Sequence, residues 1–139
     1  MQRDNLRVVA ERLLHYEAVV ENPETAAFRV SEKLRHLVLS TLLGGAGFRA
    51  LLARALHLAK GRAPELSAVE VKTDGSLAGL SKVLRHSRST PMANGEVMLI
   101  TELLVLLDTY IGEALMLRLV QDVWPKATLG ALKEEESDE

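Results

Sequence analysis

Residues 96–124 most strongly constrain the fold of this 139-residue chain, because apolar side chains dominate almost the whole stretch. The segment VMLITELLVLLDTYIGEALMLRLVQDVW (97–124) has charged residues spaced along its length: Glu102, Asp108, Glu113, Arg118 and Asp122. No uncharged run in it reaches the roughly 18 residues that a membrane-spanning helix needs, so no membrane span is expected. At helical spacing, apolar side chains would cover nearly the full circumference. The sequence therefore predicts one helix over about 96–124 that is buried on most sides.

Two kinds of burial would satisfy this helix: the centre of the chain's own bundle, or an interface with a second copy. Only three other helices, one of them short, are predicted, so the sequence favours the interface and hence a homodimer. Gly112 inside the helix costs about 1 kcal/mol against alanine, which predicts close approach of a neighbouring backbone. The residues expected in this interface are Leu103, Leu106, Leu107, Ile111, Gly112, Leu115 and Trp124.

Three further helices are predicted, over residues 4–21, from Asn22-Pro23 to about Leu43, and over about 48–61. On the first helix the apolar face is expected to comprise Leu6, Val9, Ala10, Leu13, Leu14 and Val20. Its polar face comprises Arg7, Glu11 and His15, and the second helix is expected to expose Arg29, Glu32, Lys33 and His36. Gly44 is expected to adopt a left-handed conformation at the end of the second helix, with residues 45–47 forming a short turn.

A small β-hairpin is predicted at about 68–80. Val69 and Val71 alternate with polar residues, and Asp74-Gly75 is a strong hairpin-turn signal of type I′. Because a two-stranded hairpin is marginal in water, it must pack on a helix or on another strand edge. The predicted fold is thus all-α, a four-helix bundle-like domain over 1–125 with the hairpin between its third and fourth helices. Residues 126–139, ending in KEEESDE, are expected to form an acidic disordered tail.

Composition narrows the classes of function. The chain has no cysteine, which excludes disulfides and thiol chemistry and fits a reducing compartment. Its first residues lack the apolar run of a signal peptide, so we expect a cytoplasmic protein. The modest positive charge of the first 90 residues is too small to indicate nucleic-acid binding. His15, His36 and His57 recur every 21 residues but each lies opposite an apolar face, so no metal site or cofactor is predicted.

His57 is the residue with the most specific chemical interpretation. It lies on the expected polar face of the third helix, between Arg54 and Lys60. Residues His57 to Gly61 resemble the His-x-x-Lys-Gly signature of histidine phosphotransfer domains, which are small helical bundles. The resemblance covers five residues and implies phosphoryl acceptance by His57, with Lys60 and Arg54 as the cations facing the phosphate. The chain departs from that family after Gly61, where Pro64 and the hairpin follow.

These observations lead to one expected function and two alternatives. The expected function is a non-enzymatic homodimeric helical module of regulatory or adaptor type, with a protein partner of unknown identity. The first alternative is a histidine phosphotransfer protein that uses His57. The second is a binder of a small apolar ligand within the leucine-rich bundle, for which the sequence offers no polar anchor.

Overall fold

The computed structural model describes residues 2–20, 26–41, 43–79 and 94–126, and it has an all-α fold with a small hairpin, as predicted. In chain order the elements are α1 (Arg3–Val20), α2 (Ala26–Thr41), α3 (Gly44–Lys60), the 3₁₀ helix η2 (Pro64–Ala68), β1 (Glu70–Val71), β2 (Leu77–Ala78), α5 (Asn94–Ile111) and α6 (Glu113–Val123). Apart from Lys126, the predicted tail lies outside the described residues. No helix of the described part is long and apolar enough to cross a lipid bilayer.

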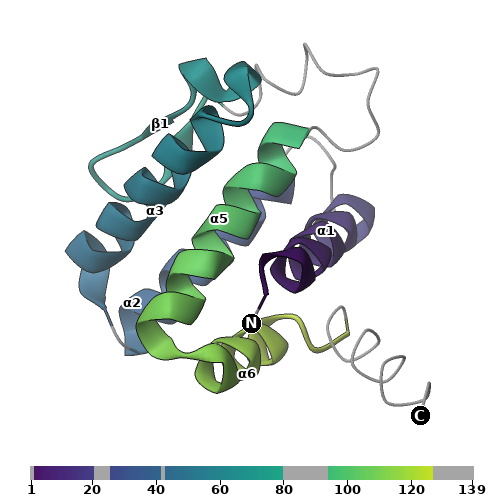
Figure 1. Cartoon of the computed structure of the whole chain (residues 1–139). Helices are drawn as coiled ribbons and strands as arrows, with labels where there is room; N and C mark the ends of the chain where they lie inside the picture. The colour runs from purple at the N-terminus through teal and green to yellow at the C-terminus, as the bar shows by residue number, and fades with distance from the viewer. Residues whose placement is uncertain (1, 21–25, 42, 80–93, 127–139) are drawn as a thin grey trace.

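The helix α5 runs through the middle of the molecule, with α3 along one side and α1 along the other (Figure 1). It also contacts α2, and α6 crosses its C-terminal end. These neighbours bury most of its apolar side chains within one chain: Val97, Leu99, Ile100, Leu103, Leu104 and Leu107. The expectation that the chain has too few helices to cover this segment is therefore wrong. The missing cover comes from α1, α2 and α3 together, since each directs its apolar face at α5.

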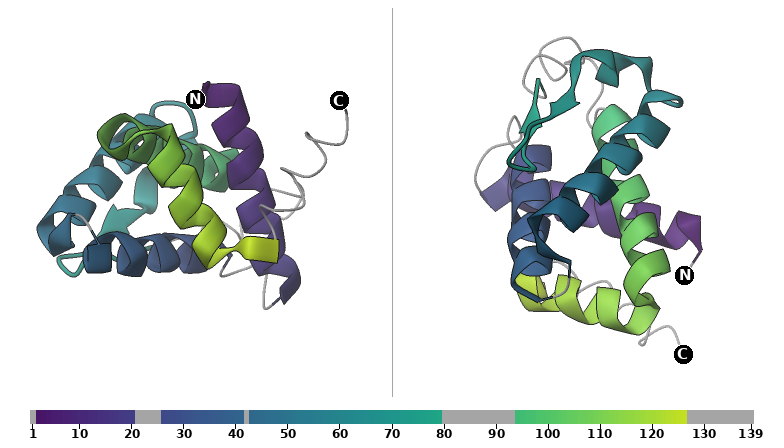
Figure 2. Two further views of the ribbon diagram at one scale, coloured as in Figure 1. Left: turned by 90° about the horizontal axis from the view of Figure 1, so that it is seen from below. Right: turned by 90° about the vertical axis from the view of Figure 1, so that its left-hand side faces the viewer.

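The predicted single helix over 96–124 is also wrong, because the chain breaks it at Gly112. This residue has φ 88° and ψ 156°, a conformation that glycine adopts readily and that other residues avoid. The break lets α6 turn across the ends of α5 and α2 (Figures 1 and 2). Among the described residues, a Cβ atom at Gly112 would meet nothing within 4 Å, so none of them makes the predicted close approach of a backbone to Gly112.

The hairpin forms where it was predicted and packs alongside α3 (Figure 2). Glu70 pairs with Ala78 and Val71 with Leu77 in antiparallel register. The turn differs from the predicted type I′, since Gly75 has a positive φ of 89° while Asp74 does not. Instead the Asp74 carboxylate accepts hydrogen bonds from the backbone N–H and the hydroxyl of Ser76, at 2.9 and 2.6 Å. These hydrogen bonds close a loop that is slightly longer than the two-residue loop of a type I′ turn.

The α2–α3 connection is tighter than expected. Gly44 has the predicted positive φ, at 71°, but α3 begins at once, so residues 45–47 form its first turn rather than a separate loop. The predicted capping pair at positions 22 and 23 lies outside the described residues. The short connection places α3 against α5 and completes the cover of the central helix.

Candidate functional site

The helix α1 has two contrasting faces. Its inner face is buried against α5 and α2 and is formed by Leu6, Ala10, Leu13, Leu14 and Glu17. On its outer face Val8 and Val19 are 50% and 71% exposed. Val20, expected on the apolar face, is 57% exposed and is the last residue of the helix. Val8 and Val19 thus place one exposed apolar side chain near each end of an outer face that also contains exposed polar residues.

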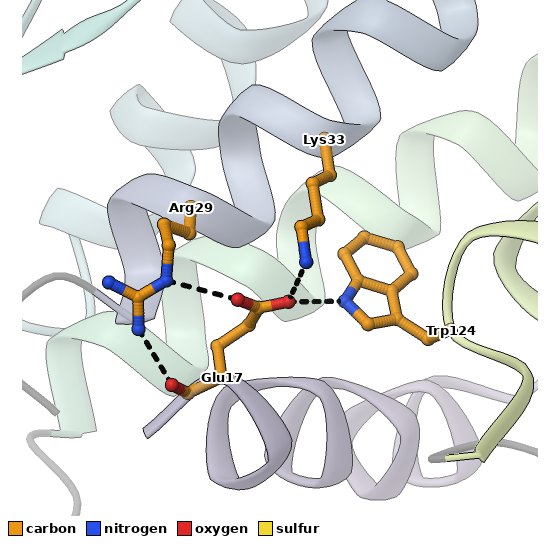
Figure 3. A network of polar contacts seen from close by, with 4 residues as sticks. All are labelled: Glu17, Arg29, Lys33 and Trp124. Atoms are coloured by element: carbon orange, nitrogen blue, oxygen red, sulfur yellow. Dashed lines mark hydrogen bonds and ion pairs between the residues drawn. The ribbon is translucent and has the colours of Figure 1, made fainter. Parts of the chain in front are cut away.

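Glu17 lies among the apolar residues of the inner face, with 1% of its surface exposed. Its carboxylate accepts hydrogen bonds from Arg29 Nε at 3.0 Å and from Trp124 Nε1 at 2.8 Å, and it is ion-paired with Lys33 Nζ (Figure 3). A second Arg29 nitrogen, Nη2, donates to the backbone carbonyl of Glu17 at 2.6 Å. The Lys33 ammonium also lies 5.9 Å from the centre of the Trp124 ring. Each acceptor oxygen of Glu17 therefore has a donor, as a buried charge requires.

The electrostatics of Glu17 follow from these contacts. Burial alone would raise the pKa of its carboxyl, but the hydrogen bonds from Lys33, Trp124 and Arg29 outweigh burial and hold the pKa below its ordinary value. Glu17 is therefore ionised in the folded protein at neutral pH. A permanently ionised carboxylate enclosed by its donors is suited to positioning helices rather than to accepting a proton from a substrate.

The Glu17 network joins three parts of the chain that are far apart in sequence. Glu17 comes from α1, Arg29 and Lys33 from α2, and Trp124 from the end of α6. Trp124 is fully buried, and the chain reaches Lys126 two residues later. The network consequently fixes the segment after α6 against α1.

An open groove of about 700 Å³ lies along this outer face. Its lining residues are Val8, Glu11, Arg12, His15, Tyr16, Val19, Val20 and Lys126. All but Lys126 come from α1, so the groove is essentially one helix face bordered by the segment that the Glu17 network holds in place. It combines exposed apolar ends with a charged and aromatic middle. This is the candidate functional site.

His57 lies on the exposed side of α3, as predicted. Arg54 is also exposed, and Lys60, the last residue of α3, is half-buried. Gly61 follows as the C-terminal cap, so the helix ends at Lys60. The three polar side chains thus share one side of the helix and lie outside the α1 groove.

The residues predicted to form an interface on 96–124 are not brought together on one surface. Leu103, Leu107 and Trp124 are buried by the chain itself, at 0, 2 and 0% exposure, so they have no surface to offer a second copy. Leu106 and Ile111 are half-buried. Gly112 is exposed, and Leu115, at 38%, is exposed on α6. The predicted interface therefore reduces to a small corner at the α5–α6 junction.

The apolar cavity beside α5 and the clustering of potential metal ligands bear on the remaining hypotheses. The apolar cavity between α2, α5 and α6 has a volume of about 10 Å³, the space of about one water molecule. Among the described residues, no three or more His, Asp and Glu side chains gather closely enough to hold a metal ion. The apolar-ligand hypothesis thus gains no support from this cavity.

The sequence analysis missed the Glu17 network. It assigned no role to Glu17 and placed Arg29 and Lys33 on a solvent-facing side, whereas both approach a buried carboxylate. The available signal was the position of Glu17, three residues after Leu14 and four after Leu13 on the apolar face. A carboxylate at such a position needs buried partners, which directs attention to cations on a neighbouring helix.

Comparison of the chain with known proteins finds no matching family model, no matching curated protein and no matching solved structure. Function is therefore argued from the geometry of α1 and its groove.

Proposed function

We propose that this protein is a non-enzymatic interaction module of regulatory or adaptor type that acts as a homodimer. The observation that carries the proposal is the outer face of α1, where exposed valines border an open groove. Exposed apolar surface beside polar residues is typical of protein–protein contact sites. The absence of cysteine from the chain agrees with a reducing compartment, and we place this function in the cytoplasm.

The polar groups near this face support an interaction role over a catalytic one. The Glu17 carboxylate is enclosed by its three donors, and its pKa is lowered rather than tuned towards neutrality. Catalytic carboxyls that exchange protons need a pKa near the working pH and access to the substrate. Glu17 thus fits the role of holding α1 in position so that its outer face is presented as a rigid surface.

Sedimentation of the full chain over about 1 to 100 µM tests the homodimer, because a dimer with a dissociation constant in this range changes mass with concentration. We expect the weight-average mass to rise from that of one 15.3 kDa chain towards twice that value. A chain that stays monomeric over the whole range would contradict the homodimer.

The position of His57 favours a second candidate function, phosphotransfer. His57 is exposed, and Arg54 and Lys60 lie on the same side of α3, where cations would stabilise phosphoryl oxygens. Incubation with a small phosphoryl donor should then add the mass of one phosphoryl group to the wild type and none to His57→Gln. If both proteins remain unmodified, phosphotransfer through His57 is excluded under those conditions.

A further inference from the structure

We infer that two copies of this chain associate through their α1 helices, packed antiparallel about a two-fold axis. This inference rests on the homodimer proposed above and names its contact surface. The surface, here called the outer stripe, consists of Val8, Glu11, Arg12, His15, Tyr16 and Val19. All six line the groove, and five are exposed, while Tyr16 is half-buried.

The spacing of the outer stripe is symmetric. Successive members lie three, one, three, one and three positions apart, so the spacing of the stripe is the same from either end. It also has the same residue type, valine, at both ends. A two-fold axis perpendicular to two antiparallel helices relates one end of such a stripe to the other end in the second copy. This spacing, which one face of an α-helix normally shows, is compatible with an isologous antiparallel pair.

The residues that this axis brings together are chemically complementary. Val8 lies opposite Val19 of the second copy, and the reciprocal contact repeats at the other end. On one flank of the pair Glu11 comes beside His15 of the second copy, and on the other flank Arg12 comes beside Tyr16. A carboxylate beside an imidazole and a guanidinium beside an aromatic ring are both favourable contacts. Each of them forms twice by symmetry.

A second copy fits the outer stripe better than the chain's own residues 127–139, which follow Lys126 at the edge of the groove. Those residues end in a strongly acidic run, whereas the stripe contains both Glu11 and Arg12 and offers no excess of positive charge. The stripe spans most of α1, a helix of 18 residues or about 27 Å. One helix pair is small for a stable interface, so we expect a dissociation constant in the micromolar range.

Charged substitutions at the ends of the stripe test the inference. Val8→Asp and Val19→Asp should each raise the dimer dissociation constant by at least about tenfold, since each places two unpaired charges in the interface. Both sites are exposed, so circular dichroism should show an unchanged helix content. Leu115→Asp, at the α5–α6 corner, is the matched control and should leave dimerisation unchanged.

Mixing variants tests the antiparallel direction. Val8→Asp chains mixed with Val19→Lys chains should recover the dimer, because aspartate then lies opposite lysine at one end and valine opposite valine at the other. Val8→Asp mixed with Val8→Lys should not recover it. Recovery in the second mixture instead of the first would show a parallel pair and overturn the inference.

The outcomes separate this inference from the proposed function. One outcome is that the wild type dimerises, Leu115→Asp abolishes the dimer, and the two valine variants still dimerise. This outcome would overturn the α1 contact but not the homodimer. A wild type that is monomeric at about 100 µM overturns the homodimer and the α1 contact with it.

Discussion

The helices α1 and α5 each contain 18 residues, yet they place their apolar side chains in opposite ways. α5 is far more apolar, but its leucines are buried by neighbours on several sides. α1 is more polar, but three of its valines, Val8, Val19 and Val20, line the outer groove and are at least half exposed. The surface available for association is therefore not where the sequence has the most apolar residues. It is on the outer face of α1, where Val8 and Val19 are exposed among the described residues.

The difference has a simple geometric cause. α5 lies between α1 and α3 and against α2, so three inner faces converge on it. α1 lies at the edge of the molecule and is held there by the Glu17 network from one side only. A central helix needs apolar residues all round, whereas an edge helix needs them on one face. We propose that the exposed valines on the other face of α1 take part in a contact with a second copy.

The largest expected effect is the difference in stability between two aspartate substitutions, one in α5 and one in α1. Leu103→Asp should cost more than about 4 kcal/mol, because Leu103 is fully buried and the new carboxylate would have no partner. Val19→Asp should change the free energy of unfolding by less than about 0.5 kcal/mol, because the site is exposed. Urea denaturation at a concentration where the wild type is monomeric measures both. Equal decreases in the free energy of unfolding would contradict the difference in burial between the two helices.

Removing the carboxylate that holds α1 should have the next largest effect. Glu17→Ala should lower the free energy of unfolding by about 3–5 kcal/mol, since Arg29, Lys33 and Trp124 lose a shared acceptor in a buried site. Glu11→Ala, on the exposed face of the same helix, is the control and should cost less than about 0.5 kcal/mol. If the two substitutions cost the same, the network does not hold α1 in place.

A buried carboxyl on α5 should respond to pH in the opposite sense from Glu17. Burial raises the pKa of Glu96 to about 7, against a smaller opposing effect of the hydrogen bond with the Ala27 backbone. Because the pKa in the unfolded chain is near 4.5, the stability that Glu96 contributes is complete below about pH 4.5 and is lost as the pH rises through about 7. Glu17, with its lowered pKa, contributes stability at neutral pH that is lost as the solution is acidified below about pH 4.5.

The Glu96 response can be isolated by comparing wild type with Glu96→Gln at pH 5 and pH 8. The wild type should lose about 2–3 kcal/mol more than the variant between these two pH values, since one pKa unit corresponds to about 1.4 kcal/mol. Urea titrations at the two pH values measure the difference. Parallel pH profiles for the two proteins would show that Glu96 does not titrate with a raised pKa.

The smallest expected effect concerns the end of α5. Gly112→Ala should cost about 2 kcal/mol, because alanine is strained at φ 88° and ψ 156° although no neighbouring atom blocks its Cβ. Gly61→Ala is the matched control, since Gly61 has φ −66° and its Cβ would make an ordinary contact at 3.5 Å. Gly61→Ala should be neutral or slightly stabilising. A neutral Gly112→Ala would show that α5 and α6 join into one helix in solution.

Local patterns predicted much of the fold. The all-α class, the hairpin around Asp74-Gly75 and the left-handed Gly44 each depend on residues close together in the sequence. The break at Gly112 was not predictable in the same way, because the helical apolar pattern continues across it and a single glycine costs a helix only about 1 kcal/mol. The burial of Leu103 and Leu107 depends on which helices surround α5, and helical periodicity does not specify neighbours.

The candidate site was less accessible to sequence reasoning than the fold. The outer stripe is visible as a spacing in α1, but the exposure of its residues depends on how the described helices pack around α1. Glu17 finds Arg29 and Lys33 at separations of 12 and 16 residues and Trp124 at a separation of 107. No local rule pairs residues at such distances. Only the packed arrangement shows that Glu17 is buried against α2 and Trp124 while the outer stripe of the same helix is largely exposed.

Cysteine cross-linking tests the central claim, an antiparallel contact between α1 helices, most directly. The chain has no cysteine of its own, so single cysteines at positions 8 and 19 report only on each other. Under mild oxidation, Val8→Cys mixed with Val19→Cys should give a disulfide-linked mixed dimer. Val8→Cys alone should give little, because two residues at position 8 lie about 16 Å apart in the antiparallel pair, beyond the reach of a disulfide. Efficient linkage of Val8→Cys to itself, with none in the mixture, would contradict the antiparallel α1 dimer.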